Sequence, residues 1–99
     1  MVDYIHRHYY EKITINEIAK SGTVSRSKCC ELFKKYLSQS PNNYLILYRI
    51  FKAKELLRNT NMSISEVALN CGFYSGSYFT LMFRRETGDT PTGYRTKYS

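Results

Sequence analysis

Two pairs of adjacent cations, Lys34-Lys35 and Arg84-Arg85, stand at matching places in the two halves of the chain, each directly after a phenylalanine. Ammonium and guanidinium groups bind phosphate oxygens through charge-assisted hydrogen bonds. The 99 residues contain 15 Lys and Arg against 8 Asp and Glu, which gives a formal net charge of +7. This excess favours a polyanionic partner, with nucleic acid first and an anionic membrane surface second.

Side chains suited to catalysis or metal binding are few. His6 and His8 are the only histidines, and a separation of two residues puts them on different sides of a helix. No serine–aspartate arrangement or glycine-rich phosphate loop accompanies them. We therefore expect no enzymatic activity, no bound metal and no cofactor.

The cysteines and the apolar runs bear on the cellular compartment. Cys29, Cys30 and Cys71 are an odd number without C-x-x-C spacing, which favours small apolar thiols in a reducing compartment and leaves a redox switch as the alternative. No segment approaches the ~20 apolar residues of a membrane span. The opening "MVDYIHRHYYEKI" carries charges where a signal peptide needs an apolar run. We expect a cytoplasmic protein with no membrane partner.

The same sequence pattern occurs twice along the chain. The segment "ITINEIAKSGTVSRSKCCELFKKYLSQSPNNY" aligns with "MSISEVALNCGFYSGSYFTLMFRRETGDTPTGY". Glu17 aligns with Glu66, and Gly22 with Gly72, so that one residue has been added in the turn of the second copy. Two copies of one supersecondary unit is the simplest interpretation.

Helix-start signals are duplicated in the same way. They are, in chain order, Thr14 with Glu17, Ser25, Ser40 with Pro41, Ser63 with Glu66, Ser75, and Thr90 with Pro91. A hydroxyl residue followed three residues later by Glu has the form of a capping box. Serine is a good N-cap, and proline at a first helical position loses no hydrogen bond. Each copy is therefore predicted to hold a short helix, a tight turn, a longer helix and the start of another.

Apolar residues recur with helical rather than strand spacing. The stripes expected to face inward are Cys29, Leu32, Phe33 and Tyr36 in the first copy, and Phe79, Met82 and Phe83 in the second. The helix that starts at Pro41 carries two apolar rows, one of Ile46, Ile50, Ala53 and Leu57 and one of Tyr44, Leu47, Tyr48 and Phe51. A helix that is apolar on two sides is predicted to be held by both copies. An opening helix containing Tyr4, Ile5, His8 and Tyr9 is expected to cover the first copy.

The predicted fold is all-α, with two helix-turn-helix subdomains joined by a central linker helix. We expect one domain over residues 1–99, divided at about 2–39, 40–58 and 59–99. The linker from Pro41 to Leu57 is about 25 Å long at 1.5 Å per residue. Major grooves recur on one face of a duplex about every 34 Å. Two second helices held by such a spacer are therefore predicted to enter adjacent major grooves of double-stranded DNA.

The sequence resembles the DNA-binding domain of AraC-type bacterial transcription regulators over essentially its whole length. The resemblance rests on "INEIAKSGTVSRSKCCELFKKY", on "YRIFKAKELL" and above all on "ISEVALNCGFYSGSYFTLMFRRETGDTPTGYR". It implies about seven helices, with a recognition helix of each unit in successive major grooves. The implied base-reading residues are Arg26, Ser27, Cys30, Glu31, Gly76, Ser77, Thr80 and Leu81. The candidate phosphate contacts are Ser25, Lys28, Lys34, Lys35, Ser75, Arg84 and Arg85.

The family resemblance also implies a setting. Its members usually activate transcription, and their DNA-binding domain is fused to a sensing or receiver module. We expect such an N-terminal module in the full-length protein, RNA polymerase as a further candidate partner, a nucleoid-associated location, and a monomeric state for the domain alone.

Four residues depart from the family pattern. Cys29 stands where leucine is common, and Ser38 replaces the glycine matched by Gly88. Glu31 and Leu81 stand where some members carry a base-reading arginine. A glutamate can accept from the amino group of cytosine and a leucine can contact the methyl group of thymine.

Two other classes of function use some of the same features. A basic helical module that binds a protein or a membrane surface has the same charge, but it does not require a matched pair of capped units. RNA is a poorer partner, because its deep, narrow major groove excludes a helix.

Overall fold

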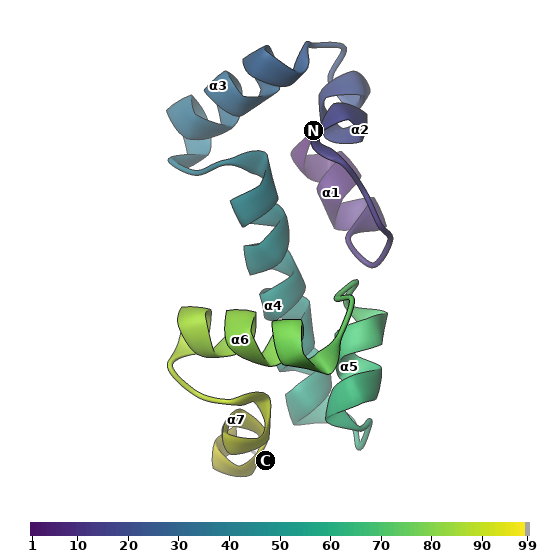
Figure 1. Cartoon of the computed structure of the whole chain (residues 1–99), viewed down its shortest axis with the longest axis vertical. Coiled ribbons are helices and arrows are strands. Elements are labelled where there is room, and N and C mark those ends of the chain that lie inside the picture. Colours follow the sequence, from purple (N-terminus) through teal and green to yellow (C-terminus); the bar gives the residue numbers. More distant parts are fainter. Residues whose placement is uncertain (99) are drawn as a thin grey trace.

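The computed structural model describes residues 1–98, and within them it contains seven α-helices and no strand (Figure 1). The helices are α1 (Val2–His8), α2 (Ile15–Ser21), α3 (Arg26–Leu37), α4 (Pro41–Asn59), α5 (Ile64–Asn70), α6 (Gly76–Thr87) and α7 (Pro91–Tyr98). This arrangement confirms the predicted all-α fold, with α2–α3 and α5–α6 as the two helix-turn-helix pairs and α4 between them. The molecule is elongated, with extents of 42 × 22 × 21 Å.

The predicted N-caps are present at the longer helices. The Oγ of Ser25 accepts the backbone N–H of Lys28 at 3.1 Å, and the Oγ of Ser75 accepts that of Tyr78 at 3.1 Å. Pro41 occupies the first turn of α4, as expected. These caps satisfy N–H groups that a helix start leaves without a partner, so local sequence determines where α3 and α6 begin.

The two capping boxes differ. Ser63 and Glu66 form the reciprocal pair, with each side chain accepting the other residue's N–H at 3.1 Å. Thr14 accepts the N–H of Glu17 at 3.2 Å, but the Glu17 carboxylate instead accepts the Thr14 hydroxyl at 3.1 Å and the hydroxyl of Tyr4 at 3.1 Å. Thr14 therefore caps α2 as expected, while the carboxylate of Glu17 accepts from two hydroxyls instead of from the backbone N–H of Thr14.

The two turns show which residue was added. In the first turn, Gly22, Thr23 and Val24 donate their N–H groups to carbonyls of α2 in the pattern that Cys71, Gly72 and Phe73 repeat on α5. Thr23 (φ 53°) and Gly72 (φ 89°) are the left-handed residues of the two turns. Gly72 therefore corresponds to Thr23 rather than to Gly22, which corrects the sequence alignment. The additional residue of the second turn is Tyr74.

The first unit packs around a small core. Its buried members are Ile5, Ile18, Ala19, Cys29, Phe33 and Leu45. Tyr36, predicted to face inward, is 71% exposed. The last turn of α3 extends beyond the elements that cover Phe33, and Tyr36 there lines an open groove of about 440 Å³ against the start of α1.

The second unit has a larger core. It contains the predicted Phe79, Met82 and Phe83 together with Phe73 and Tyr94, and α4 contributes its row from Ile46 to Leu57. The rings of Phe73, Phe79, Phe83 and Tyr94 follow one another at centroid distances of 5.0, 5.6 and 5.3 Å. Aromatic contacts at these distances favour a single packing arrangement.

Helix α4 holds the two units together, although not through both predicted rows. The row from Ile46 to Leu57 is buried against the second unit as expected. On the other side the first unit packs on Leu45, with Tyr44 and Tyr48 partly buried, whereas Phe51 is 52% exposed. Phe51 belongs to neither core cluster, and its ring contacts only its helix neighbours Tyr48 and Lys52 among the aromatic and cationic contacts of residues 1–98.

Left-handed residues end both α3 and α6. Gly88 (φ 83°) follows α6, and Ser38 (φ 57°) takes the same conformation after α3. The N–H of each residue donates to a carbonyl four residues earlier. The turn therefore forms without glycine in the first unit, at the steric cost that a side chain has at positive φ.

Candidate nucleic-acid interface

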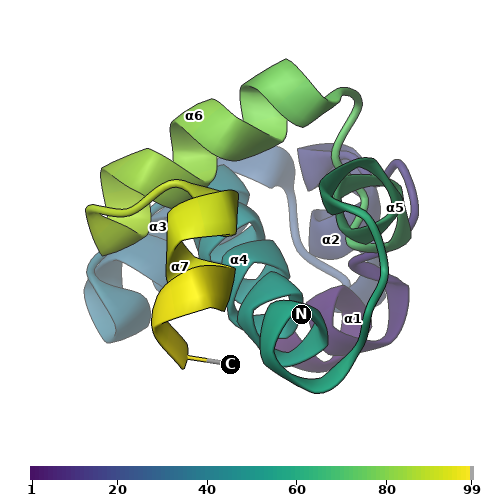
Figure 2. The same cartoon turned by 90° about the horizontal axis from the view of Figure 1, so that it is seen from below.

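The arrangement of α3 and α6 is the main feature of the site. Both helices run in the same general direction in two perpendicular views, with α3 tilted relative to α6 (Figures 1 and 2). They lie on the side of α4 away from α1 (Figure 2). Helix α4 is a single helix of 19 residues, about 28 Å long at 1.5 Å per residue. An unbroken helix therefore separates the two second helices of the helix-turn-helix pairs.

The solvent-facing side of α3 carries the residues expected to read bases. Arg26, Ser27 and Glu31 are exposed and Cys30 is half-buried, while Cys29 points into the core. The Glu31 carboxylate lies 3.5 Å from the Nζ of Lys28. This exposed ion pair is weak, so both side chains can move apart to meet another partner.

The corresponding side of α6 is smaller and less polar. Ser77 is exposed, Thr80 and Gly76 are half-buried, and Leu81 is 61% exposed. A Cβ atom added to Gly76 would have no other heavy atom within 4 Å. The start of α6 therefore presents backbone to solvent, and a large apolar side chain stands one turn further along the helix.

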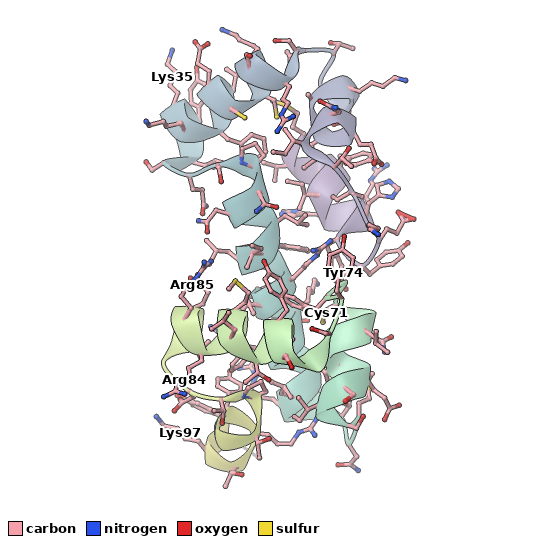
Figure 3. All side chains as sticks on the ribbon, viewed as in Figure 1. Lys35, Cys71, Tyr74, Arg84, Arg85 and Lys97 are labelled. Carbon is pink, nitrogen blue, oxygen red and sulfur yellow. The ribbon has the colours of Figure 1, made fainter. Side chains whose placement is uncertain are left out.

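The basic pairs are exposed and reach in different directions. Lys34, Lys35, Arg84 and Arg85 are all exposed. Figure 3 shows Arg85 on the side of α6 that faces the first unit and Arg84 on the side that faces α7, near Lys97. The Nε of Arg85 donates to the Glu86 carboxylate at 2.9 Å.

Sequence reasoning missed Lys97, which is exposed and lies 3.9 Å from the Asp89 carboxylate. Its cation extends the basic edge formed by Arg84. The basic residues at the end of the last helix were the available signal. One terminal turn is too short for a periodic pattern to show which way the Lys97 side chain points. The remaining phosphate candidates, Ser25 and Ser75, cap α3 and α6 and are exposed.

Sequence reasoning also missed a polar junction between the two units. Arg49 of α4 is only 8% exposed, and its guanidinium donates to the carbonyl oxygens of Tyr9 and Glu11 at 2.8 Å each. Burial lowers the pKa of Arg49, and the nearby Tyr74, Tyr78 and Cys71 act in the opposite direction. A lone arginine among apolar residues of the linker was the available signal.

No group of three or more metal-ligating side chains occurs within residues 1–98. His6 stacks on Tyr48 at 4.1 Å and its Nε2 is 2.8 Å from the hydroxyl of Tyr44, whereas the Nδ1 of His8 contacts Glu11 at 2.6 Å. The two histidines therefore serve separate packing contacts. In the same part of the chain, no helix is long and apolar enough to cross a bilayer.

Two helices that run in the same general direction with exposed polar faces, each the second helix of a capped pair, define a tandem helix-turn-helix domain. Residues 18–97 match the sequence profile of a family described as "Helix-turn-helix domain". A transcriptional regulator from Chromobacterium violaceum with an AraC-type DNA-binding domain has the same structure, with a TM-score of 0.94 at 33% identity over 99% of this chain and 88% of that one. The chain belongs to the AraC-type helix-turn-helix family, the DNA-binding domains of transcription regulators, as its sequence predicted.

Further relatives agree. YdeC of Bacillus subtilis (strain 168), an uncharacterised regulator of the helix-turn-helix type, is 43% identical over 96% of this chain and 33% of its own length. The lactose operon transcription activator of Staphylococcus xylosus is 34% identical over 99% of this chain and 35% of its own. The chain thus spans about a third of these two relatives. They are regulators rather than enzymes, which confirms the prediction that this domain has no enzymatic activity.

A solved complex is also similar. The DNA-binding domain of the transcriptional factor AdpA, determined with a target DNA, superposes with a TM-score of 0.93 at 31% identity. The match covers 98% of this chain and 87% of that one.

Proposed function

We propose that this domain binds a specific sequence of double-stranded DNA by placing α3 and α6 in successive major grooves. The observation that carries the proposal is that α3 and α6 run in the same general direction along the unbroken helix α4, with α3 beside its start and α6 crossing it further along (Figure 1). Helix α4 is about 28 Å long and the molecule extends 42 Å along its longest axis, which is the scale of the 34 Å groove repeat. AdpA, whose similar domain was solved on a target DNA, supports the same mode.

The exposed faces divide into two roles. In this proposal Arg26, Ser27, Cys30 and Glu31 of α3 and Gly76, Ser77, Thr80 and Leu81 of α6 meet base edges. The cations Lys28, Lys34, Lys35, Arg84 and Arg85 and the capping residues Ser25 and Ser75 meet phosphates. Phosphate contacts orient a protein on the duplex without reading its sequence. Specificity therefore rests on the eight residues of the first set.

The wider setting follows from the relatives. We propose that the domain is the DNA-binding part of a transcription activator, as the name of the Staphylococcus relative states for that protein. A sensing or receiver module would make up much of the remaining length, and RNA polymerase would be the second macromolecular partner. The domain alone is proposed to be monomeric and to act on the nucleoid in the cytoplasm.

Selection of bound oligonucleotides from a random duplex pool, followed by footprinting, tests this function. The expected result is two short protected tracts centred about one helical turn apart. Log K should fall with log [salt] with a slope between about −3 and −4.5, because each of the five cations releases about 0.9 counterion when it meets a phosphate and two of them, Lys28 and Arg85, are paired with carboxylates in the free protein. If duplex DNA gives no footprint while anionic vesicles or a protein partner bind, the domain is instead a basic interaction module.

A further inference from the structure

Hydrophobic packing alone leaves the relative orientation of the two units open. The buried residues form two separate clusters, one in each unit, and α4 contributes different residues to each. A shared helix fixes the distance between the units, but a unit packed on a helix can still roll or tilt on its apolar contact. Contacts that run directly between the units must therefore set the angle between α3 and α6.

Arg49 of α4 lies at such a contact. It lies one turn from both Leu45, which belongs to the first core, and Ile46, which belongs to the second. Its guanidinium donates two hydrogen bonds of 2.8 Å to main-chain carbonyls of Tyr9 and Glu11, in the segment between α1 and α2. Within residues 1–98 it makes no ion pair with a carboxylate. A buried guanidinium is costly without hydrogen bonds, so this segment of the first unit is held against α4.

The α5–α6 turn of the second unit packs against the same hydrogen-bonded site. A Cβ atom on Gly72 would lie 2.4 Å from the Tyr9 carbonyl oxygen and 2.8 Å from the Nε of Arg49. The φ of +89° also requires glycine here. The α5–α6 turn, which leads directly into the recognition helix α6, therefore packs against the carbonyl that Arg49 binds in the other unit.

A second direct contact lies beside the first. The Nζ of Lys12 sits 4.9 Å from the ring centroid of Tyr74, the residue added in the second turn. Figure 3 shows Tyr74 projecting from that turn toward the first unit. Lys12, Arg49, Gly72 and Tyr74 line one cavity of about 370 Å³ at the junction. The extra residue of the second copy thus extends the same bridge between the units.

We propose that Arg49 is a positioning residue that, together with Gly72, fixes the angle between the two helix-turn-helix units and so sets the spacing between the two DNA segments that α3 and α6 read. The inference rests on the proposed binding to two grooves. Its consequence is measurable because two linked binding modules gain affinity only when the geometry allows both to bind at once.

The test uses the oligonucleotide selected by the wild-type domain and a set of variants with one or two base pairs inserted or deleted between the two protected tracts. Each base pair rotates one tract by about 35° relative to the other. Probes that keep only one tract measure each unit separately. Affinities of wild type and Arg49→Met are measured on every probe. Arg58→Met is the matched control, because Arg58 is an exposed arginine on the same helix.

Wild type should prefer one spacing and lose about tenfold in affinity when it changes by one base pair. Arg49→Met should lose about tenfold on the optimal probe, vary less than about threefold across spacings, and bind the one-tract probes as wild type does. Arg58→Met should retain the wild-type profile. An unchanged spacing profile in Arg49→Met, or an equal loss on the one-tract probes, would overturn the inference.

Two further variants keep the test decisive if Arg49→Met does not fold, as judged by circular dichroism. Gly72→Ala forces the turn away from Tyr9 while the arginine remains, and Lys12→Met removes only the contact with Tyr74. Both should flatten the spacing profile, Gly72→Ala more strongly, and sharp profiles in both would refute the role of the junction. A wild-type domain that protects two tracts yet shows no spacing preference would also refute it, whereas a single protected tract would refute the two-groove proposal itself.

Discussion

Gly76 offers a direct test of which face of α6 contacts DNA, because a side chain added at this position would contact no other part of the protein. A Cβ atom there would meet no other heavy atom within 4 Å, and its backbone is in the first turn of α6 rather than in a left-handed conformation. Glycine inside a helix is less stable than alanine by about 0.5–1 kcal/mol. At the first helical position the gain is smaller, so Gly76→Ala should stabilise the fold by about 0–0.5 kcal/mol.

The same methyl group should weaken DNA binding. In the proposed complex the start of α6 approaches the base edges, and backbone without a side chain is what permits the closest approach. A methyl group added there should cost about 1–2 kcal/mol on the selected sequence, roughly a five- to thirtyfold increase in Kd. Urea unfolding followed by circular dichroism gives the stability, and fluorescence anisotropy with a labelled duplex gives the affinity.

Gly88 is the matched control at the other end of α6. A Cβ atom on Gly88 also has open space around it, but its φ of +83° is left-handed. Gly88→Ala should therefore destabilise the fold by about 1–2 kcal/mol and leave the affinity of the folded protein unchanged. The reasoning is refuted if Gly76→Ala binds the selected duplex as tightly as wild type does, or if it destabilises the fold as Gly88→Ala does.

Three further expectations are open to simple measurements. Thr23→Gly should raise the free energy of unfolding by about 1 kcal/mol, because a β-branched residue at φ 53° is strained; no gain in the urea midpoint would contradict this. Arg84→Ala should weaken binding to all duplexes about equally, whereas Thr80→Ala should change the preference at particular base pairs by roughly 1 kcal/mol; equal losses on all sequences from both variants would remove Thr80 from the readout. Burial raises the pKa of the Cys71 thiol from 9.0 to about 11, so the folded state retains a proton that the unfolded state releases, and this contribution to stability is lost as pH rises from 9 to 11. The difference in free energy of unfolding between wild type and Cys71→Ala, measured in urea, should accordingly shrink over that range. A constant difference would contradict this role of Cys71.

The sequence predicted the features that depend on neighbours along the chain. Ser25 and Ser75 fall at N-caps because the cap is completed by an N–H three residues later. The stripe of Phe79 and Phe83 is buried because a spacing of four residues keeps both side chains on one face of the helix. The same local rules placed every candidate base-reading residue outside the core.

The predictions were wrong where burial or a partner depends on elements that are distant in the sequence. Tyr36 continues the stripe of α3 and Phe51 that of α4, but periodicity does not show where the covering element ends. The alignment of Gly22 with Gly72 failed because both positions are glycine, while the equivalent left-handed residue of the first turn is Thr23. Arg49 was missed because its partners are carbonyls of residues 40 and 38 positions away, and main-chain acceptors leave no trace in the sequence.

The two copies have become unequal parts of one domain. The second unit has a closed capping box at Ser63, a glycine after its recognition helix and a run of packed aromatic rings in its core. The first unit has Cys29 and half as many buried residues, six against twelve, and it ends its recognition helix with a strained Ser38. A smaller core contributes less hydrophobic stabilisation, so the first unit depends more than the second on its packing against the shared helix α4. The turn of the second unit packs against the Tyr9 carbonyl that Arg49 binds, so the proposed orienting contact joins the unit with the smaller core to the unit with the larger one.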